Sequence, residues 1–224
     1  MNILEKKQSS NNQNASIDFK HALRTKGVKS LWHVTHIDNI PSIMMHGICS
    51  HNHAFQKYNP TDISNPKVQL IRQYKKDPIY KTSLHDYVPT FITIKNPMLF
   101  GIRDKNRDLC LLEISLDVLS TRSFVFTDGN AANGPTRFSN SIYDIDMVKW
   151  DVIHAQRWEE CGRERAAEVL ISHPIKSDFI EAIHCYSFDS VKKINNVSPP
   201  CLISQNLYFQ DSPKKQSIHF TPVA

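Results

Sequence analysis

The feature that most constrains the fold of this chain is a series of short apolar runs with the length and composition of β-strands. The runs are SLWHVTH (30–36), TFITI (90–94), LCLLEISL (109–116), EVLIS (168–172) and EAIHCYSF (181–188). Helical spacing lies between them at 38–47 and 67–76, where aliphatic residues recur every three to four positions. Glycine-rich phosphate loops of the GxGxxG or P-loop type do not occur in the sequence. The pattern therefore predicts an α+β domain rather than a doubly wound nucleotide fold.

The length of 224 residues corresponds to one domain with loose ends. We expect a flexible N-terminal extension at 1–29, a folded domain at 30–210 and a loose C-terminal tail at 211–224, because the first 16 residues are rich in Gln, Asn and Ser. The N-terminus lacks the apolar core of a signal peptide, and no run approaches the roughly 20 apolar residues of a membrane span. Five scattered cysteines without a CxxC pair indicate reduced thiols. These features predict a cytoplasmic protein without a membrane partner.

Positive charge is concentrated locally rather than spread over the chain. The net charge is +5, but residues 31–199 carry 19 basic and 19 acidic side chains. Within them, residues 57–81 hold six basic side chains against Asp62 and Asp77. Charge alone is explained most simply by a solvated helix face, although a basic stretch in a neutral body also suits an anionic ligand.

A group of histidines and one cysteine lies between residues 33 and 53. Such residues could ligate zinc. Their spacing matches no common structural zinc pattern, and no second CxxC or HxxxH completes it. We therefore expect no metal, and a zinc-dependent nuclease remains a minor alternative. The residues concerned are His33, His36, His46, Cys49, His51 and His53.

Two further patterns point to chemistry. His33 and Thr35 share one face of a predicted strand that leads into a helix near Asn39, a geometry that could hold an amide and a ribose. Surface histidines beside a helix cap would explain the same residues equally well. Glu168 begins an apolar strand between two alanines and three aliphatic residues. Because a buried carboxylate is costly unless it is paired or used, we favour a functional role for Glu168.

Four ordered blocks of the sequence resemble the DarT family of DNA ADP-ribosyltransferase toxins. The blocks are WHVTHIDNIPSIMMHGICS (32–50), LHDYVPTFITIKNPML (84–99), FTDGNAA (126–132) and AEVLI (167–171), and a terminal Leu-Tyr-Phe at 207–209 is similar to the family's end. The resemblance covers roughly residues 30–190. Each block alone is weak, but four in the family's order are specific.

The resemblance implies an ADP-ribosyltransferase fold, with a split, bent mixed β core, flanking helices and NAD+ bound in the cleft. It implies transfer of ADP-ribose from NAD+ to a base in single-stranded DNA, most often thymine, with release of nicotinamide and a block to replication. It also implies a macrodomain antitoxin of the DarG type as partner. An ADP-ribosyltransferase acting on guanine, RNA or protein remains an alternative, as does a non-catalytic module that binds nucleic acid or NAD+.

The resemblance also implies roles for individual residues. Glu168 matches the family's catalytic glutamate, and Arg72 matches its essential arginine. The expected NAD+ contacts are His33, Thr35, Asn39 and Met98. The expected DNA contacts are Lys75, Lys76, Tyr87, Asn130 and Arg137, with Phe126 and Phe138 as candidates for base stacking. The chain departs from the family at Thr90–Ile92, where aromatic residues are frequent, and at Lys95, where arginine is frequent; both changes bear on the choice of base.

Overall fold

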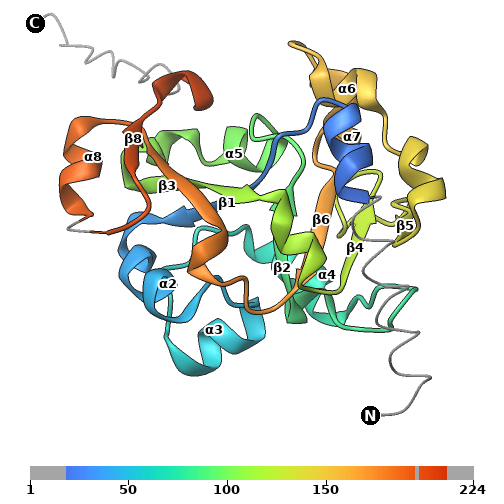
Figure 1. Cartoon of the computed structure of the whole chain (residues 1–224), viewed down its shortest axis with the longest axis horizontal. Helices are drawn as coiled ribbons and strands as arrows, with labels where there is room; N and C mark the ends of the chain where they lie inside the picture. The colour runs from blue at the N-terminus through green and yellow to red at the C-terminus, as the bar shows by residue number, and fades with distance from the viewer. Residues whose placement is uncertain (1–18, 195–196, 211–224) are drawn as a thin grey trace, which may run out of the picture.

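The computed structural model describes residues 19–194 and 197–210, which form a mixed β-sheet with helices on both faces (Figure 1). The sheet has eight strands in the order β5-β4-β6-β2-β1-β3-β7-β8. Adjacent strands are antiparallel, except that β7 and β8 are parallel. The predicted α+β class is confirmed. The strands are β1 (Ser30–His36), β2 (Tyr87–Phe91), β3 (Leu109–Ser115), β4 (Phe124–Thr127), β5 (Phe138–Ser139), β6 (Glu168–Ser172), β7 (Ile180–Cys185) and β8 (Cys201–Ile203).

The sheet is split between β1 and β2. These two strands pair only at Trp32 and Phe91, whereas β1 pairs with β3 along its whole length. Pro89 lies in β2 with its carbonyl directed at the side chain of His33 in β1. In an antiparallel sheet the N–H and C=O of one residue point to the same neighbouring strand. Pro89 therefore lacks an N–H only on the side that faces the gap between β1 and β2, where no ladder hydrogen bond is lost. The sequence predicted a strand at 90–94, after the proline. Because Pro89 is tolerated within the strand, β2 lies at 87–91 instead.

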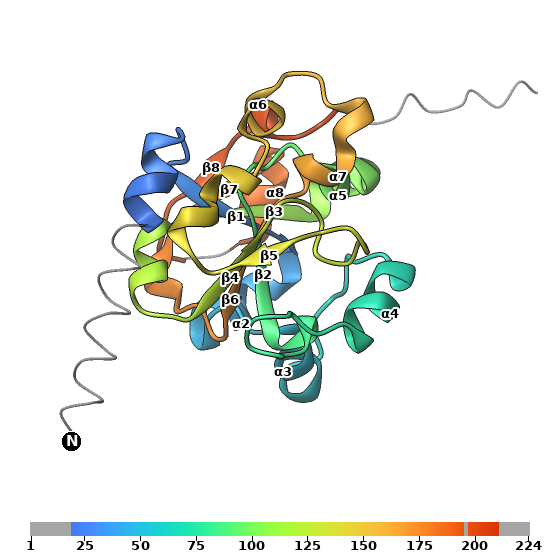
Figure 2. The same cartoon turned by 90° about the vertical axis from the view of Figure 1, so that its right-hand side faces the viewer.

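The helices form two groups separated by the sheet (Figure 2). On one side lie α2 (Ile40–His46), α3 (His51–Lys57) and α4 (Pro66–Tyr74). On the other lie α5 (Pro97–Gly101), α6 (Trp150–His154) and α7 (Gly162–Arg165), while α8 (Phe188–Lys193) packs near the β8 edge. No helix in the described residues is long and apolar enough to cross a membrane.

The N-terminal boundary of the folded domain differs from the prediction. Residues 19–25 are helical, and Phe19 and Leu23 are fully buried in the main core. Phe19 lies 4.8 Å from both Phe124 and Phe126, measured between ring centroids. Residues 19–29 therefore belong to the domain rather than to a flexible extension, because their two large apolar side chains complete its core. The remaining predicted extension (1–18) and the predicted tail (211–224) lie outside the described residues.

Two segments predicted to be irregular contain regular structure. Residues 48–66 include α3, which begins where the Ser50 hydroxyl accepts a hydrogen bond from the backbone N–H of His53. Residues 126–140 are not a simple loop, because β4 and β5 pair at both ends of it and leave residues 128–137 between them. Phe126 is fully buried in the core, so it is not available to stack on a base.

Candidate active site

Glu168 begins β6 and has only 1% of its surface exposed. Its backbone N–H donates to the Thr127 hydroxyl (3.0 Å), which fixes the start of the strand against β4. Its carboxylate accepts a hydrogen bond from the backbone N–H of Ala131 (2.8 Å). The carboxylate is thus held between two neighbouring segments of chain, and its hydrogen bonds offset the cost of burying it.

The partner of Glu168 is Arg72, 96 residues earlier in the sequence. Arg72 lies on the inner side of α4, and its Nη1 is 3.2 and 3.1 Å from the two carboxylate oxygens. Its Nη2 is buried and has no hydrogen-bond partner. Because an unsatisfied buried donor is costly, Nη2 is the atom of this pair that could donate to a ligand.

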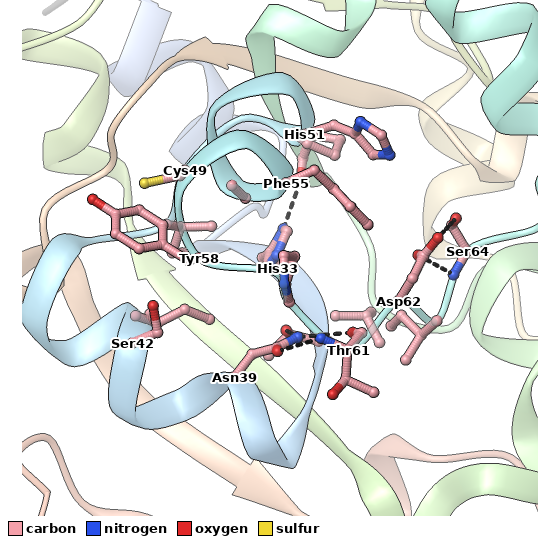
Figure 3. A pocket seen from close by; sticks show the side chains of 18 of the residues that line it. His33, Asn39, Ser42, Cys49, His51, Phe55, Tyr58, Thr61, Asp62 and Ser64 are labelled. Atoms are coloured by element: carbon pink, nitrogen blue, oxygen red, sulfur yellow. Dashed lines mark hydrogen bonds between the residues drawn. The ribbon is translucent and has the colours of Figure 1, made fainter.

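Arg72 lines a cavity of about 300 Å³. Figure 3 shows this cavity with His33, His51 and Asn39 among the side chains around it. Glu168 does not line this cavity, so Arg72 connects the cavity with the carboxylate. In Figure 3, His33 lies between α3 on one side and the contact of Asn39 with Thr61 on the other. The lining residues that the sequence predicted are His33, Thr35, Asn39, Arg72, Tyr87 and Met98.

The orientation of His33 follows from one hydrogen bond. Its Nδ1 lies 2.9 Å from the carbonyl oxygen of Pro89. Burial lowers the pKa of His33, while this hydrogen bond opposes the shift. At neutral pH the ring is therefore uncharged, with the proton on Nδ1 and an acceptor at Nε2.

Asn39 closes one end of the cavity by holding a loop. Its side-chain N–H₂ donates to the Thr35 hydroxyl (3.1 Å) and to the Thr61 carbonyl (2.9 Å), and its carbonyl accepts from the Thr61 N–H (2.9 Å). Thr35 and Asn39 thus lie together as predicted, but their described hydrogen bonds are to each other and to the loop.

Three stacked rings form a wall that the sequence did not reveal. The ring of His51 lies 4.3 Å from that of Phe55 and 4.0 Å from that of His85. His85 Nε2 is 2.8 Å from the side-chain oxygen of Gln69, one turn before Arg72 on α4. Burial, and then the nearby His51 and Arg72, lower the pKa of His85 to about 4. The stack therefore anchors the helix that carries Arg72 through a neutral histidine.

The predicted DNA contacts divide into three groups. Tyr87 lines the cavity, but its hydroxyl donates to Asp77. Lys75 and Lys76 lie at the end of α4, where Lys75 Nζ donates to the Asn133 carbonyl (2.6 Å).

Asn130 and Arg137 belong to the segment 128–137. The side chain of Asn130 accepts from the Ala132 N–H, and the guanidinium of Arg137 pairs with Asp128 (2.9 Å) while its side chain remains 65% exposed. These contacts show that both residues shape the segment that supplies Ala131.

Side chains of the histidine-rich segment contact other rings. Among the described residues, no group of three or more His, Cys, Asp or Glu side chains could hold a metal ion. Instead, His51 stacks on His85, and His46 stacks on Tyr58 with ring centroids 4.4 Å apart.

The split mixed sheet with flanking helices is the fold of the DarT ADP-ribosyltransferases, the class that the sequence blocks resemble. The cavity and the buried Arg72–Glu168 pair lie within this fold. The family described as "ssDNA thymidine ADP-ribosyltransferase, DarT" matches residues 32–209. The chain belongs to this family, which confirms the predicted family and the predicted enzyme class, an NAD+-dependent DNA ADP-ribosyltransferase.

Relatives and solved structures agree with this assignment. A DNA ADP-ribosyl transferase of Escherichia coli O127:H6 is 29% identical over 174 residues, covering 70% of this chain and 80% of the relative. The structure of Thermus sp. 2.9 DarT in complex with ADP-ribosylated ssDNA is 25% identical, with a TM-score of 0.71 over 82% of this chain and 97% of that one. The structure of the same Thermus protein in complex with NAD+ shares the fold, with a TM-score of 0.67, 24% identity and coverage of 81% of this chain and 98% of that one.

A further relative joins two activities in one chain. A DNA ADP-ribosyl transferase-DNA ADP-ribosyl glycohydrolase fusion protein of Thermosipho africanus is 27% identical over 194 residues, which cover 81% of this chain and 50% of the fusion protein.

Proposed function

We propose that Glu168 and Arg72 carry the transfer of ADP-ribose from NAD+ to a thymine base in single-stranded DNA, the activity of the family to which this chain belongs. The observation that carries the proposal is the buried Arg72–Glu168 pair, whose arginine keeps one unpaired N–H group beside the cavity. In the reaction, the bond between nicotinamide and ribose breaks, a bond between that ribose carbon and the base forms, and the base loses its ring proton.

Glu168 is suited to stabilise the positive charge that develops on the ribose as its glycosidic bond loosens. A fixed carboxylate does this better than a mobile one, because no energy is spent on reorienting it during the reaction. The hydrogen bond from Ala131 and the contact with Arg72 keep the Glu168 carboxylate in one position.

Arg72 is suited to bind or polarise an oxygen of the substrate. A guanidinium remains protonated at neutral pH, so Arg72 does not serve as a simple base. One of its N–H groups holds Glu168, and Nη2 remains available for a carbonyl of thymine or for a phosphate.

The cavity has the chemistry to hold NAD+, which supplies the ADP-ribosyl group. His33 presents an acceptor for the carboxamide, and Met98 and Phe55 offer apolar surface for a ring. Thr35 and Asn39 lie on the side of the cavity that we assign to the ribose of NAD+. Asn39 also holds the loop at Thr61 by a hydrogen bond.

The DNA strand would approach across the segment 128–137 and the end of α4. Lys75 and Lys76 supply positive charge there. Asn130 shapes the segment 128–137, and the exposed side chain of Arg137 lies on it. Phe138 is half-buried, and Lys75 Nζ lies 5.3 Å from the centre of its ring. Phosphate contacts and base stacking together are the usual means of holding a single strand.

The test is mass spectrometry of a mixed-sequence single-stranded oligonucleotide after incubation with the protein and NAD+. The expected product carries one ADP-ribose unit on thymine and is absent with Glu168→Ala. Equal modification of a strand without thymine would contradict the choice of base. Release of nicotinamide without a DNA adduct would redirect the search to RNA or protein acceptors.

A macrodomain antitoxin of the DarG type is the proposed partner, acting with this chain in the cytoplasm as a toxin–antitoxin pair. The Thermosipho fusion of a transferase with a glycohydrolase supports the coupling of these activities. Expression of the active chain should inhibit growth, and co-expression of a DarG-type glycohydrolase should restore it. Growth inhibition that persists with Glu168→Ala would argue against DNA modification as its cause.

A further inference from the structure

The solvent-facing side of α4 is apolar, while its inner side is polar. Leu70, Ile71 and Tyr74 are 58, 50 and 77% exposed, and their spacing places them on one stripe of the helix. On the inner side, Gln69 contacts His85 and Arg72 contacts Glu168. An ordinary surface helix has the opposite arrangement, so the outer stripe of α4 has the character of a binding surface.

The turn that follows α4 carries two further exposed apolar residues. Asp77 is fully buried, and its carboxylate accepts hydrogen bonds from the backbone N–H groups of Ile79, Tyr80 and Thr82 and from the Tyr87 hydroxyl. The turn is therefore held in one shape, with Ile79 39% and Tyr80 47% exposed. We call the five exposed apolar residues the α4 platform: Leu70, Ile71, Tyr74, Ile79 and Tyr80.

Positive charge is concentrated along the segment that carries the α4 platform. Lys67, Lys76 and Lys81 are all exposed, at the start of α4, at its end and in the turn. The single acid between residues 66 and 81 is Asp77, which is buried and occupied by the hydrogen bonds of the turn. Exposed aromatic rings among lysines are the combination that binds single-stranded nucleic acid, because the rings stack on bases and the lysines follow the phosphates.

The α4 platform is attached to the reaction centre on two sides. It lies on the same helix as Arg72. At its other end, the Tyr80 hydroxyl accepts a hydrogen bond from Asn140 (2.9 Å), and Lys75 Nζ reaches the Asn133 carbonyl. Both contacts join the platform to the chain on either side of β5, close to the segment that supplies Ala131 to Glu168.

We propose that the α4 platform binds the nucleotides that flank the target base, which stack on Tyr74 and Tyr80 while Lys67, Lys76 and Lys81 contact their phosphates. The proposal rests on the proposed function and adds to it a second, sequence-tolerant contact outside the reaction centre. The α4 stripe faces away from Arg72, so this contact serves nucleotides further along the strand rather than the target base. The DNA must therefore be long enough to reach around the helix.

The test compares two oligonucleotides with the same central thymine, one of about 5 and one of about 20 nucleotides. The variants are Tyr74→Ala, Tyr80→Ala and their combination, with Tyr74→Trp as a variant that keeps a stacking ring. Tyr143 is 94% exposed on a different surface segment (142–147), so Tyr143→Ala is the matched control. The measurement is kcat and KM for each oligonucleotide.

For the wild type, KM should be lower for the long oligonucleotide than for the short one. The double alanine variant should raise KM for the long oligonucleotide about tenfold, with kcat retained and much less change for the short one. Tyr74→Trp and Tyr143→Ala should behave like the wild type. Equal losses on both lengths, or no loss on either, would overturn the proposal.

A separate binding measurement distinguishes this proposal from the proposed function. If the wild type modifies no DNA, the proposed function fails, but fluorescence anisotropy with a labelled 20-nucleotide probe still measures the α4 platform. Weaker binding by the double variant supports the platform, and unchanged binding overturns it. Unchanged DNA binding with loss of neutralisation by a co-expressed antitoxin would also overturn it, and would assign the surface to a protein.

Discussion

The proposed reaction centre gives different tasks to two N–H groups of one residue, Arg72. Nη1 contacts Glu168, and we propose that Nη2, which has no hydrogen-bond partner, donates to the substrate. Lysine at this position keeps the charge but presents a compact ammonium in place of the planar fork. We expect Arg72→Lys to lower kcat on the order of 100-fold, as measured by adduct formation on a thymine-containing oligonucleotide. Arg24→Lys, at an exposed arginine, is the control, and an Arg72→Lys enzyme as fast as this control would contradict the role of the fork.

A second prediction at the residue scale concerns pH. Burial and the neighbouring His51 and Arg72 lower the pKa of His85 to about 4, against about 6.5 in the unfolded chain. The unfolded state therefore binds the proton more readily, and the stability gained above pH 6.5 is lost as the pH falls towards 4. From pH 7 to pH 5 this amounts to on the order of 1–2 kcal/mol.

The measurement is the free energy of unfolding in denaturant at pH 7 and pH 5. His85→Gln removes the titrating group and retains a polar side chain near Gln69. The variant should lose less stability than the wild type over this interval. The same pH dependence in both proteins would show that other groups dominate.

At the scale of elements, α2 ends at a glycine that no other residue can replace. Gly47 has φ of +79°, and a Cβ there would collide with the carbonyl oxygen of Ile175. Gly47→Ala should cost more than about 1 kcal/mol, because both the backbone conformation and the close approach exclude a side chain. Gly134→Ala is the matched control, since a Cβ at Gly134 meets nothing within 4 Å. Thermal unfolding measures both, and an equally stable Gly47→Ala protein would refute the close approach.

The segment 128–137 is held by one acid. Asp128 is buried and pairs with Arg163 and Arg137, both at 2.9 Å. Asp128→Asn removes the charged partner of Arg137 and leaves Arg163 with its contact to Glu164, so the position of the Ala131 N–H at Glu168 should become less fixed. We expect kcat to fall about tenfold or more, in the same oligonucleotide assay. Asp117→Asn, which breaks an exposed pair with Lys20, should leave kcat unchanged.

The sequence contained enough information for elements with strong local patterns. The apolar run that follows Glu168 predicted β6 with the observed bounds. The sequence did not reveal α3, because this helix is polar and its one local signal is a serine cap. It also did not reveal the pairing of β4 with β5, which consists of a two-residue ladder. Phe19 and Leu23 lie next to a polar N-terminal segment, so composition hid their place in the core.

In the candidate site too, some residues could be predicted from the sequence and others could not. Glu168 was found because a carboxylate is out of place in an apolar strand, and Arg72 because of the family resemblance. The stacked rings of Phe55, His51 and His85 join residues up to 34 positions apart through side chains alone. The hydrogen bond from the backbone N–H of Ala131 to Glu168 could be made by almost any residue type, so the sequence does not indicate it. Such features arise from the fold and could not be read from periodicity or composition.

At the scale of the whole molecule, the C-terminal end packs on β3 and β7, whereas Glu168 begins β6 on the other side of the split. Tyr208 is buried beyond β8, and its hydroxyl donates to the backbone carbonyls of Leu109 (3.1 Å) and His184 (2.8 Å) in the half of the sheet that holds β3 and β7. Tyr208→Phe removes both bonds without changing the packed ring, so we expect a loss of about 1 kcal/mol and a fall in Tm of roughly 2–4 °C. Because Arg72 and Glu168 are attached to α4 and β6, activity at 25 °C should be unchanged. Measuring Tm and the initial rate on one oligonucleotide tests both parts of this prediction. A loss of rate that accompanies the fall in Tm would show that the C-terminal end and the reaction centre are coupled.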